Sequence, residues 1–252
     1  MRKNSQILLL ASATAMSCMP AHAGTRQTTS NTGIVPTPAY QEGPYIRIDA
    51  GASFISGADA KLDLPLGQGV TQKAKFKTGF VYGGAVGYNF GEVALEAELD
   101  NTHNQTDGIQ NLSLSFRQTS LLGNVVWMPK YEGITFLLGG GLGAQFQDSN
   151  FGGFSSTASN VIVAGDTFSY NYSKKSDTAF IGQIKAGVSI PIDERWSFDA
   201  AYKLRFVEET DLADGSATYK ATALATATSY SSKLTLDSHL SHLLTAGFSY
   251  KF

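Results

Sequence analysis

The sequence is poor in cysteine, in charge and in long apolar runs, and each shortage excludes a class of protein. Charged residues make up 16% of the 252 positions, and the formal net charge is −2. No cluster of lysine and arginine supplies the electrostatic footprint of nucleic-acid binding, so we expect no nucleic-acid partner. Beyond the start of the chain, no apolar run reaches the roughly 18 residues that a membrane-spanning helix needs. Aromatic residues, at 11%, are too frequent for a disordered chain, which leaves a folded, glycine-rich protein.

The first 23 residues have the pattern of an export signal. Arg2 and Lys3 form a charged start, an apolar stretch follows, and a triplet of small residues around a histidine ends at Ala23. We expect cleavage after Ala23 and a flexible periplasmic segment over residues 24–43. Lipidation at Cys18 is the alternative, but the residues before Cys18 match a lipobox poorly. Cleavage would remove the only cysteine, so the mature chain needs a stabilising device other than disulfides, such as a closed sheet.

From residue 44 onward the chain alternates apolar and polar residues in segments of strand length. The expected strands cover residues 44–54, 79–90, 92–101, 117–128, 133–147, 179–191, 195–206 and 239–252. The connections between them alternate between tight turns and long loops, the latter near residues 55–78, 102–116, 148–178 and 207–238. Three short periplasmic turns and four long extracellular loops are typical of an outer-membrane barrel. The pattern therefore predicts an all-β, eight-stranded, antiparallel up-and-down transmembrane β-barrel over residues 44–252.

Each expected strand keeps its charges on one face. In the segment 195–206, Trp196 and Phe198 share the apolar face, whereas Asp199 and Lys203 lie on the other. A soluble, lipocalin-like barrel with its apolar face inward would show the same alternation and is an alternative. Two features favour an outward apolar face. Aromatic residues gather near strand ends, as in interfacial girdles, and glycines share the charged faces, where they leave room for long side chains in a narrow barrel.

The last strand, 239–252, alternates strictly and ends on an aromatic residue. With the stretches 45–51, 95–99 and 138–143, it resembles the OmpA/OmpX-like family of small outer-membrane barrels, over residues 44–252. The resemblance implies a monomer in the outer membrane of a Gram-negative-type bacterium, in contact with outer-membrane lipid. It covers only the barrel, so we expect no periplasmic peptidoglycan-binding domain of the OmpA kind.

The same resemblance implies a role for the C-terminal aromatic residues. Phe248, Tyr250 and Phe252 occupy alternate positions of the last strand. In the family, a terminal phenylalanine on such a strand is read by the barrel-assembly machinery. We therefore expect these residues to form the assembly signal and the machinery to be a partner.

The polar faces of the expected strands gather five acids and five bases. These residues are Arg47, Asp49, Glu96, Glu98, Asp100, Lys185, Asp199, Lys203, Arg205 and Lys251. Because an unpaired buried charge costs several kcal/mol, we expect these groups to pair across strands and to plug the lumen. The alternative is a small gated pore in which Glu96 or Glu98 exchanges partners with Lys203 or Arg205. Ion conductance would then rise in a Glu96→Ala, Glu98→Ala double variant.

Histidines supply the only candidate chemistry. His239-Leu240-Ser241 has the His-x-Ser spacing seen in outer-membrane lipid A deacylases, and a base two residues from a hydroxyl could activate it. The alternation places this pair inward, away from lipid, and no acidic residue follows to orient the histidine. A lipid-modifying enzyme is thus only a third interpretation, and His103 and His242 fit solvated or interfacial positions. We expect no catalytic, cofactor-binding or metal-binding residues and no enzyme.

The long loops are the expected working surface. The loop over 148–175 is rich in phenylalanine and tyrosine, and residues 216–232 alternate alanine, threonine and serine as if hairpins extended the barrel. Aromatic side chains on adaptable loops suit contact with a protein or a polymer. We therefore expect a structural and surface-interaction, adhesin-like role, with a host or surface polymer as the candidate partner. Loops that merely shield the barrel rim are the equal alternative.

Overall fold

The computed structural model describes residues 42–63, 69–105, 115–150, 154–156, 167–220 and 227–252. The predicted export signal, its cleavage after Ala23 and nearly all of the segment 24–43 lie outside these residues. Every helix or strand element in the described part is a β-strand. That part contains no helix with the length and apolar character needed to cross a membrane.

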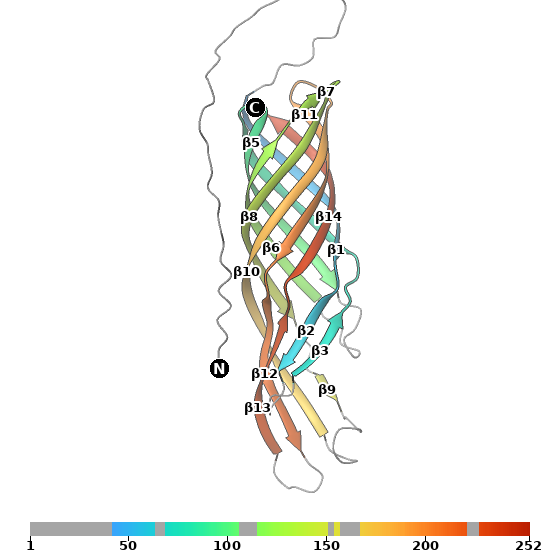
Figure 1. The fold of residues 1–252 in the computed structure, drawn as a ribbon, viewed down its shortest axis with the longest axis vertical. Coiled ribbons are helices and arrows are strands. Elements are labelled where there is room, and N and C mark those ends of the chain that lie inside the picture. Colours follow the sequence, from blue (N-terminus) through green and yellow to red (C-terminus); the bar gives the residue numbers. More distant parts are fainter. Residues whose placement is uncertain (1–41, 64–68, 106–114, 151–153, 157–166, 221–226) are drawn as a thin grey trace, which may run out of the picture. The chain divides into compact units, whose positions relative to one another are not determined.

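Eight of these strands close into an antiparallel barrel (Figure 1). They are β1 (Gly43–Ile55), β4 (Gly79–Asn89), β5 (Val93–Gln105), β6 (Ser115–Trp127), β8 (Ile134–Asn150), β10 (Thr167–Pro191), β11 (Trp196–Val207) and β14 (His239–Lys251). Each strand pairs with the next barrel strand in the chain, and β14 returns to β1 through pairs such as Ile48 with Phe248. The structure thus confirms the predicted eight-stranded up-and-down barrel.

The strand ends agree with the prediction except where strands continue beyond the barrel. β10 begins at Thr167, twelve positions before the predicted start at residue 179, because its first half pairs with a separate hairpin. β5 and β8 also run past their predicted ends, to Gln105 and Asn150. The tight connection after β6 holds the two-residue strand β7 (Lys130–Tyr131), which pairs with the start of β8.

The barrel is apolar outside and polar inside. On β10, Ile184 is 67% exposed, whereas the next side chain, Lys185, is 1% exposed. Large apolar side chains such as Ile48 and Leu142 are likewise exposed around the wall, and the charged side chains point into the lumen. This arrangement is the reverse of a lipocalin-like barrel and suits surroundings of hydrocarbon, so the soluble alternative is wrong.

Outward aromatic side chains pair across the ends of the barrel. Near the short turns, the rings of Trp196 and Tyr250 lie 5.0 Å apart between centroids, and those of Tyr88 and Phe90 lie 4.7 Å apart. At the opposite end, Phe80 stacks on Tyr82. These rings form the two belts that the sequence predicts, at the heights where amphipathic aromatic residues favour a membrane interface.

The remaining strands form a second sheet that continues from one end of the barrel (Figure 1). They are β2 (Ala58–Asp63), β3 (Gly69–Ala74), β9 (Phe154–Ser156), β12 (Thr210–Lys220) and β13 (Ala227–Leu236). The first half of β10 pairs with β9 and β12, β12 pairs with β13, and β13 pairs with β2. We call this sheet, which lies opposite the short turns, the extension. It contains the hairpin that the alternation after residue 216 predicts.

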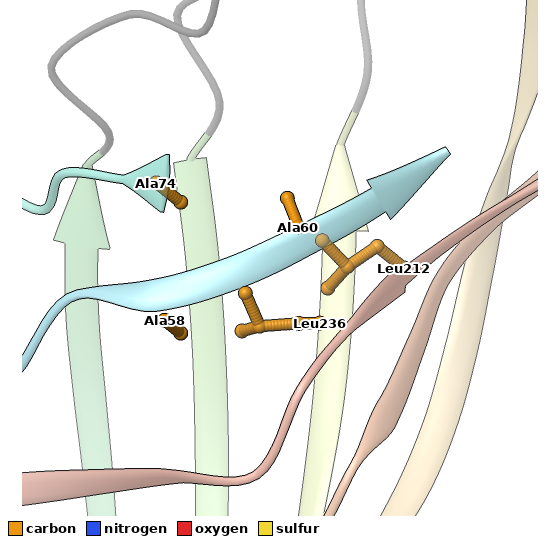
Figure 2. Packing of buried hydrophobic residues seen from close by; sticks show 5 residues of the cluster. All are labelled: Ala58, Ala60, Ala74, Leu212 and Leu236. Atoms are coloured by element: carbon orange, nitrogen blue, oxygen red, sulfur yellow. The ribbon is translucent and has the colours of Figure 1, made fainter. Parts of the chain in front are cut away.

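The extension has a small apolar core of its own (Figure 2). Its buried members come from β2, β3, β12 and β13; they are Ala58, Ala60, Ala74, Leu212 and Leu236. Phe76 and Leu234 pack against them. The pairing of β12 with β13 shifts register between Asp211 and Ala213, and Leu212 at this bulge is 1% exposed. The extension is therefore a packed layer and not a set of extended loops.

Gly247 is one of two glycines, with Gly51, at which the closing strands β1 and β14 approach too closely for a side chain. A Cβ atom on Gly247 would lie 1.9 Å from the backbone oxygen of Ile48 on β1. Backbone atoms cannot move aside as a flexible side chain can. We therefore expect Gly247→Val to prevent closure of β14 on β1, so that the variant stays unfolded or readily denatured in detergent.

The neighbouring residue offers a matched control. Ala246 precedes Gly247 on β14 and is exposed on the outer wall, so Ala246→Val places the same valine side chain toward lipid. Comparison of unboiled with boiled samples by gel electrophoresis should show a folded, faster-migrating form for wild type and Ala246→Val only. A folded Gly247→Val barrel would contradict this account of closure.

Candidate functional site

The strand register brings most of the predicted lumen charges to one level of the barrel. Arg47 and Asp49 come from β1, Glu96, Glu98 and Asp100 from β5, Lys185 from β10, and Lys203 and Arg205 from β11. These strands face one another across the lumen, and each of the eight side chains is at most 8% exposed. Four bases and four acids thus form a neutral group, which we call the lumen network.

Glu98 is the centre of the lumen network. Its Oε1 lies 2.9 Å from Lys203 Nζ and 3.0 Å from Arg205 Nη2. Its Oε2 lies 3.2 Å from Arg47 Nη2 and accepts a hydrogen bond of 3.0 Å from Asn124 Nδ2. One carboxylate therefore binds cations from both sides of the lumen. With 0% exposure, it has no access to solvent that could replace them.

Glu96 holds the side of the network nearer the short turns. Arg47 donates from Nη1 to Glu96 Oε1 over 2.6 Å, and the hydroxyl of Tyr45 donates to the same oxygen over 2.7 Å. Lys185 Nζ donates to Glu96 Oε2. The two carboxylate oxygens are thereby saturated with charge-assisted hydrogen bonds, the strong kind in a low-dielectric interior.

Arg205 and Lys203 hold the side nearer the extension. Arg205 donates from Nη2 to Asp100 and from Nε to Gln183 Oε1, the latter over 2.6 Å. Lys203 Nζ lies 3.2 Å from Asp49 Oδ2 and 3.5 Å from Asp100 Oδ2. Every base of the network thus contacts at least two carboxylates, which offsets the cost of burying it.

Buried apolar side chains also lie on both sides of the network. Toward the short turns, a cluster contains Tyr45, Ala94, Val126, Met128 and Leu137. Toward the extension, another contains Leu122, Ala179, Ile181 and Val207. The alternation in the sequence predicts polar residues on the inward faces and does not indicate these apolar clusters. In this structure the described lumen is filled with side chains, as expected for a barrel of eight strands.

Asp199 and Lys251 lie outside the lumen network. Asp199 is 5% exposed and accepts hydrogen bonds from the hydroxyls of Ser189 and Ser249. Lys251, half-buried, lines a cavity of about 20 Å³ together with Asp199 and Tyr45, near the end of the barrel with the short turns. A cavity of this size holds one or two waters and not a substrate. The predicted set of ten is therefore split, with eight members joined in one network.

The His-x-Ser pair lies inside the barrel mouth. His239 and Ser241 are 4% and 6% exposed, and His239 Nδ1 lies 3.2 Å from the backbone oxygen of Asp237. No carboxylate among the described residues contacts the imidazole, so the acid of a catalytic triad is missing. His103 is exposed, whereas His242 faces outward and bonds the hydroxyl of Tyr202 over 2.6 Å. His242 is thus interfacial, as predicted, but it is not solitary.

The proposed assembly residues face outward on β14. Phe248 contacts Phe198 of β11 edge-on, with centroids 5.6 Å apart, and Phe252 contacts Tyr250 at 5.2 Å. Phe252 is 71% exposed. These positions belong to the aromatic belt near the short turns. Recognition by the assembly machinery stays a prediction.

A second ion network fastens the extension at the bulge in β12. Lys175 Nζ lies 3.0 Å from Asp211 Oδ2, and Lys233 Nζ lies 2.8 Å from Asp211 Oδ1. Lys175 also contacts Asp214 over 2.7 Å, and the Asp211 N–H donates to Asp177 Oδ2 over 2.6 Å. Strands β10, β12 and β13 are thereby joined through Asp211. No spacing in the sequence indicates this network, because its members come from three strands whose register is not encoded locally.

Sequence reasoning also missed the uncharged members of the lumen network. Tyr45, Asn124 and Gln183 donate to Glu96 or Glu98. Tyr45 shares the strand parity of Arg47, and Gln183 shares that of Lys185, so the alternation could have identified both. Asn124 lies among apolar neighbours, and only its pairing opposite Glu96 reveals its role.

A family model for the outer membrane protein beta-barrel domain matches residues 8–252. The chain belongs to this outer-membrane β-barrel family. The family is one of outer-membrane β-barrels of Gram-negative bacteria. In such barrels the short turns generally face the periplasm and the long connections face the outside of the cell. No curated protein sequence matches the chain significantly.

Solved structures of other outer-membrane barrels share the fold. Neisserial surface protein A is 16% identical, with a TM-score of 0.47, over 83% of this chain and 97% of its own. OprG from Pseudomonas aeruginosa is 20% identical, with a TM-score of 0.42, over 85% and 98%. The protease OmpT from Escherichia coli is 10% identical, with a TM-score of 0.46, over 86% and 100%. Their names differ in function, so these similarities assign no role to this barrel.

The outer-membrane barrel depends on the neutrality of its lumen network. Replacing Glu98 by Gln keeps the side-chain volume and leaves four bases with three acids in a closed interior. We expect Glu98→Gln to lower the free energy of unfolding by about 3–5 kcal/mol, the cost of breaking a buried ion pair. Urea unfolding of the barrel in lipid vesicles, followed by tryptophan fluorescence, measures this change.

Two variants sharpen the measurement. Glu92→Gln, exposed in a periplasmic turn, should change stability by no more than about 0.5 kcal/mol. Adding Lys185→Met to Glu98→Gln restores the charge balance and should recover part of the loss. Equal stability of Glu98→Gln and wild type would show that the network contributes nothing to the fold.

The second network predicts how the extension responds to acid. Partial burial raises the pKa of the Asp211 carboxyl, but hydrogen bonds from Lys233 and Lys175 outweigh it and hold the pKa below its usual range. The resulting stability is therefore fully present above the unfolded pKa of about 3.9 and is lost as the pH falls through the lower folded pKa. We expect hydrogen–deuterium exchange in β12 and β13, corrected for intrinsic rates, to be unchanged from pH 7 to pH 5 and to rise near pH 3.

The variant Asp211→Asn should exchange rapidly in β12 and β13 at pH 7 already, with the barrel strands unaffected. Asp214→Asn is the control. Asp214 is more exposed than Asp211, and the ion pairs described above join it to one lysine, Lys175, whereas they join Asp211 to two. Its effect should be smaller. Identical protection from hydrogen–deuterium exchange in wild type, Asp211→Asn and Asp214→Asn would show that Asp211 does not attach the extension.

Proposed function

We propose that this barrel is a surface-interaction protein in which the extension makes the contacts and the barrel serves as a closed anchor. The observation that carries the proposal is the packed core of the extension, which joins β2, β3, β12 and β13 through buried side chains. Loops that only shield a rim need no core. A preformed surface favours binding, because less conformational entropy is lost when a partner docks.

The outer face of the extension offers polar contacts suited to such a partner. Ser229 and Ser231 share one face of β13 and are exposed, and Ser229 shares a hydrogen bond of 2.9 Å with Thr218 of β12. Short hydroxyl side chains on a rigid sheet supply adaptable hydrogen bonding. A glycan or a protein of the host or of the bacterial surface fits this chemistry.

The lumen argues against the alternative of a gated pore. Further buried side chains lie on both sides of the lumen network, so rearranging Glu96 and Glu98 with Lys203 and Arg205 would still leave residues such as Val126 and Ile181 in the interior. The His239–Ser241 pair argues equally against a lipid-modifying enzyme, because both side chains face inward and a lipid acyl bond lies outside the wall.

Adhesion tests the proposal directly. Escherichia coli cells displaying the wild-type barrel should bind wells coated with heparin, mucin or fibronectin more than cells without it. A variant with residues 58–74 and 210–236 replaced by short Gly-Ser linkers should return to background, at equal surface display and with an unchanged folded gel form. A second variant, Leu212→Asp, disrupts only the core of the extension and should lose binding likewise. Adhesion that survives both changes, or no adhesion by wild type, would overturn the proposal.

Planar-bilayer recording separates this proposal from a gated pore. We expect no current above baseline from the wild-type barrel or from the Glu96→Ala, Glu98→Ala double variant, because the other buried side chains of the interior remain in place. A steady current that appears or rises in the double variant would show that the barrel is a gated pore and not a closed anchor.

A further inference from the structure

Three lysines form a row on the outer face of the extension where it meets the barrel. Lys73, Lys75 and Lys77 occupy alternate positions and are all exposed. The residues between them point the other way, since Ala74 is 1% exposed and Phe76 packs against the core of the extension. Alternate positions of an extended chain lie about 7 Å apart. The core therefore holds the backbone so that three lysine side chains leave one outward face at regular intervals, and we call these three residues the lysine row.

The lysine row reaches down to the extracellular aromatic belt. The Lys77 N–H donates to the backbone oxygen of Gln105 over 2.8 Å, so the chain already runs beside β5 at this point. β4 begins two residues later, and its outward rings Phe80 and Tyr82 are 54% and 50% exposed and stacked. Such rings mark the boundary between hydrocarbon and headgroups. The lysines therefore lie at the height of the lipid headgroups.

Other basic side chains continue the row around the rim. Phe80 pairs with His103 on β5, and His103 pairs with Arg117 on β6, both exposed on the outer face. Two acids face this sector, Asp59 opposite Lys73 and Asp148 opposite Arg117. Three lysines and one arginine thus outnumber two carboxylates. Around the rim, the junction of β11 with β12 instead exposes Glu208 and Glu209.

We propose that the lysine row binds the phosphate groups of the glycolipid that forms the outer leaflet of the outer membrane. An ammonium on a long flexible stem reaches phosphate oxygens of the headgroup region while its methylenes lie along the apolar wall. Lysines at a membrane surface each add a favourable interaction with anionic lipid. The adjacent aromatic belt binds the lipid-facing part of the same molecule. This site is independent of the surface-interaction role, which uses the far part of the extension.

Native mass spectrometry of the full barrel tests the proposal. The barrel in detergent is mixed with diphosphoryl lipid A, and retained lipid is measured against concentration. We expect Lys73→Gln, Lys75→Gln, Lys77→Gln to weaken retention by about a hundredfold, roughly a factor of five per lysine. The corresponding triple arginine variant should retain the lipid. Glu208→Gln, Glu209→Gln, at the junction of β11 with β12, should not weaken retention.

Two further probes decide the chemistry and the source of the ligand. Lipid A stripped of phosphate should bind the wild-type barrel as weakly as intact lipid A binds the glutamine variant. Inorganic phosphate at millimolar concentration should fail to displace lipid A. Retention by the glutamine variant equal to that of wild type, or equal binding of the stripped lipid, would overturn the proposal. Displacement of lipid A by inorganic phosphate would show that the bound phosphate group does not have to come from a lipid, and it would indicate a soluble phosphate ligand. A folded gel form in every variant excludes misfolding as the cause.

Discussion

The pairing of β14 with β1 is the contact on which the rest of this structure depends. Hydrocarbon offers no hydrogen-bond partner, so an unpaired strand edge within the membrane would leave a row of backbone groups unsatisfied. Closure removes both edges at once. It also divides the side chains into two sets, because alternate residues of every strand must face either lipid or lumen. The inside-out distribution of polarity follows from that division.

A closed barrel of eight strands leaves an interior only as wide as its own side chains. The lumen network shows what this demands. Charges placed inside must satisfy one another, and here Glu98 contacts bases from β1, β10 and β11 at once. Glycines opposite these groups allow the strands to approach. The polar interior thereby links strands that are not neighbours in the sheet and supports the fold in place of disulfides.

Alternation made much of the fold predictable, because a period of two residues maps directly onto two faces. Trp196 and Phe198 lie outside, and Asp199 and Lys203 inside, as the pattern indicates. The alternation does not predict the partner of each charge, because the partners depend on the register between distant strands. Lys185 and Glu96 are 89 positions apart. The ordered extension was only partly visible, since its core uses alanines, such as Ala58 and Ala74, that carry little periodic signal.

One strand belongs to both layers, and this has a mechanical consequence. β10 runs unbroken for 25 residues, whereas the chain leaves the strand conformation at 56–57, 208–209 and 237–238, where β2, β12 and β13 adjoin the barrel. A pull on the extension along the barrel axis is therefore carried mainly through β10. Its ladder to β8 and β11 is loaded in shear, with many hydrogen bonds sharing the force, while the three interruptions let the outer sheet bend without tearing the wall.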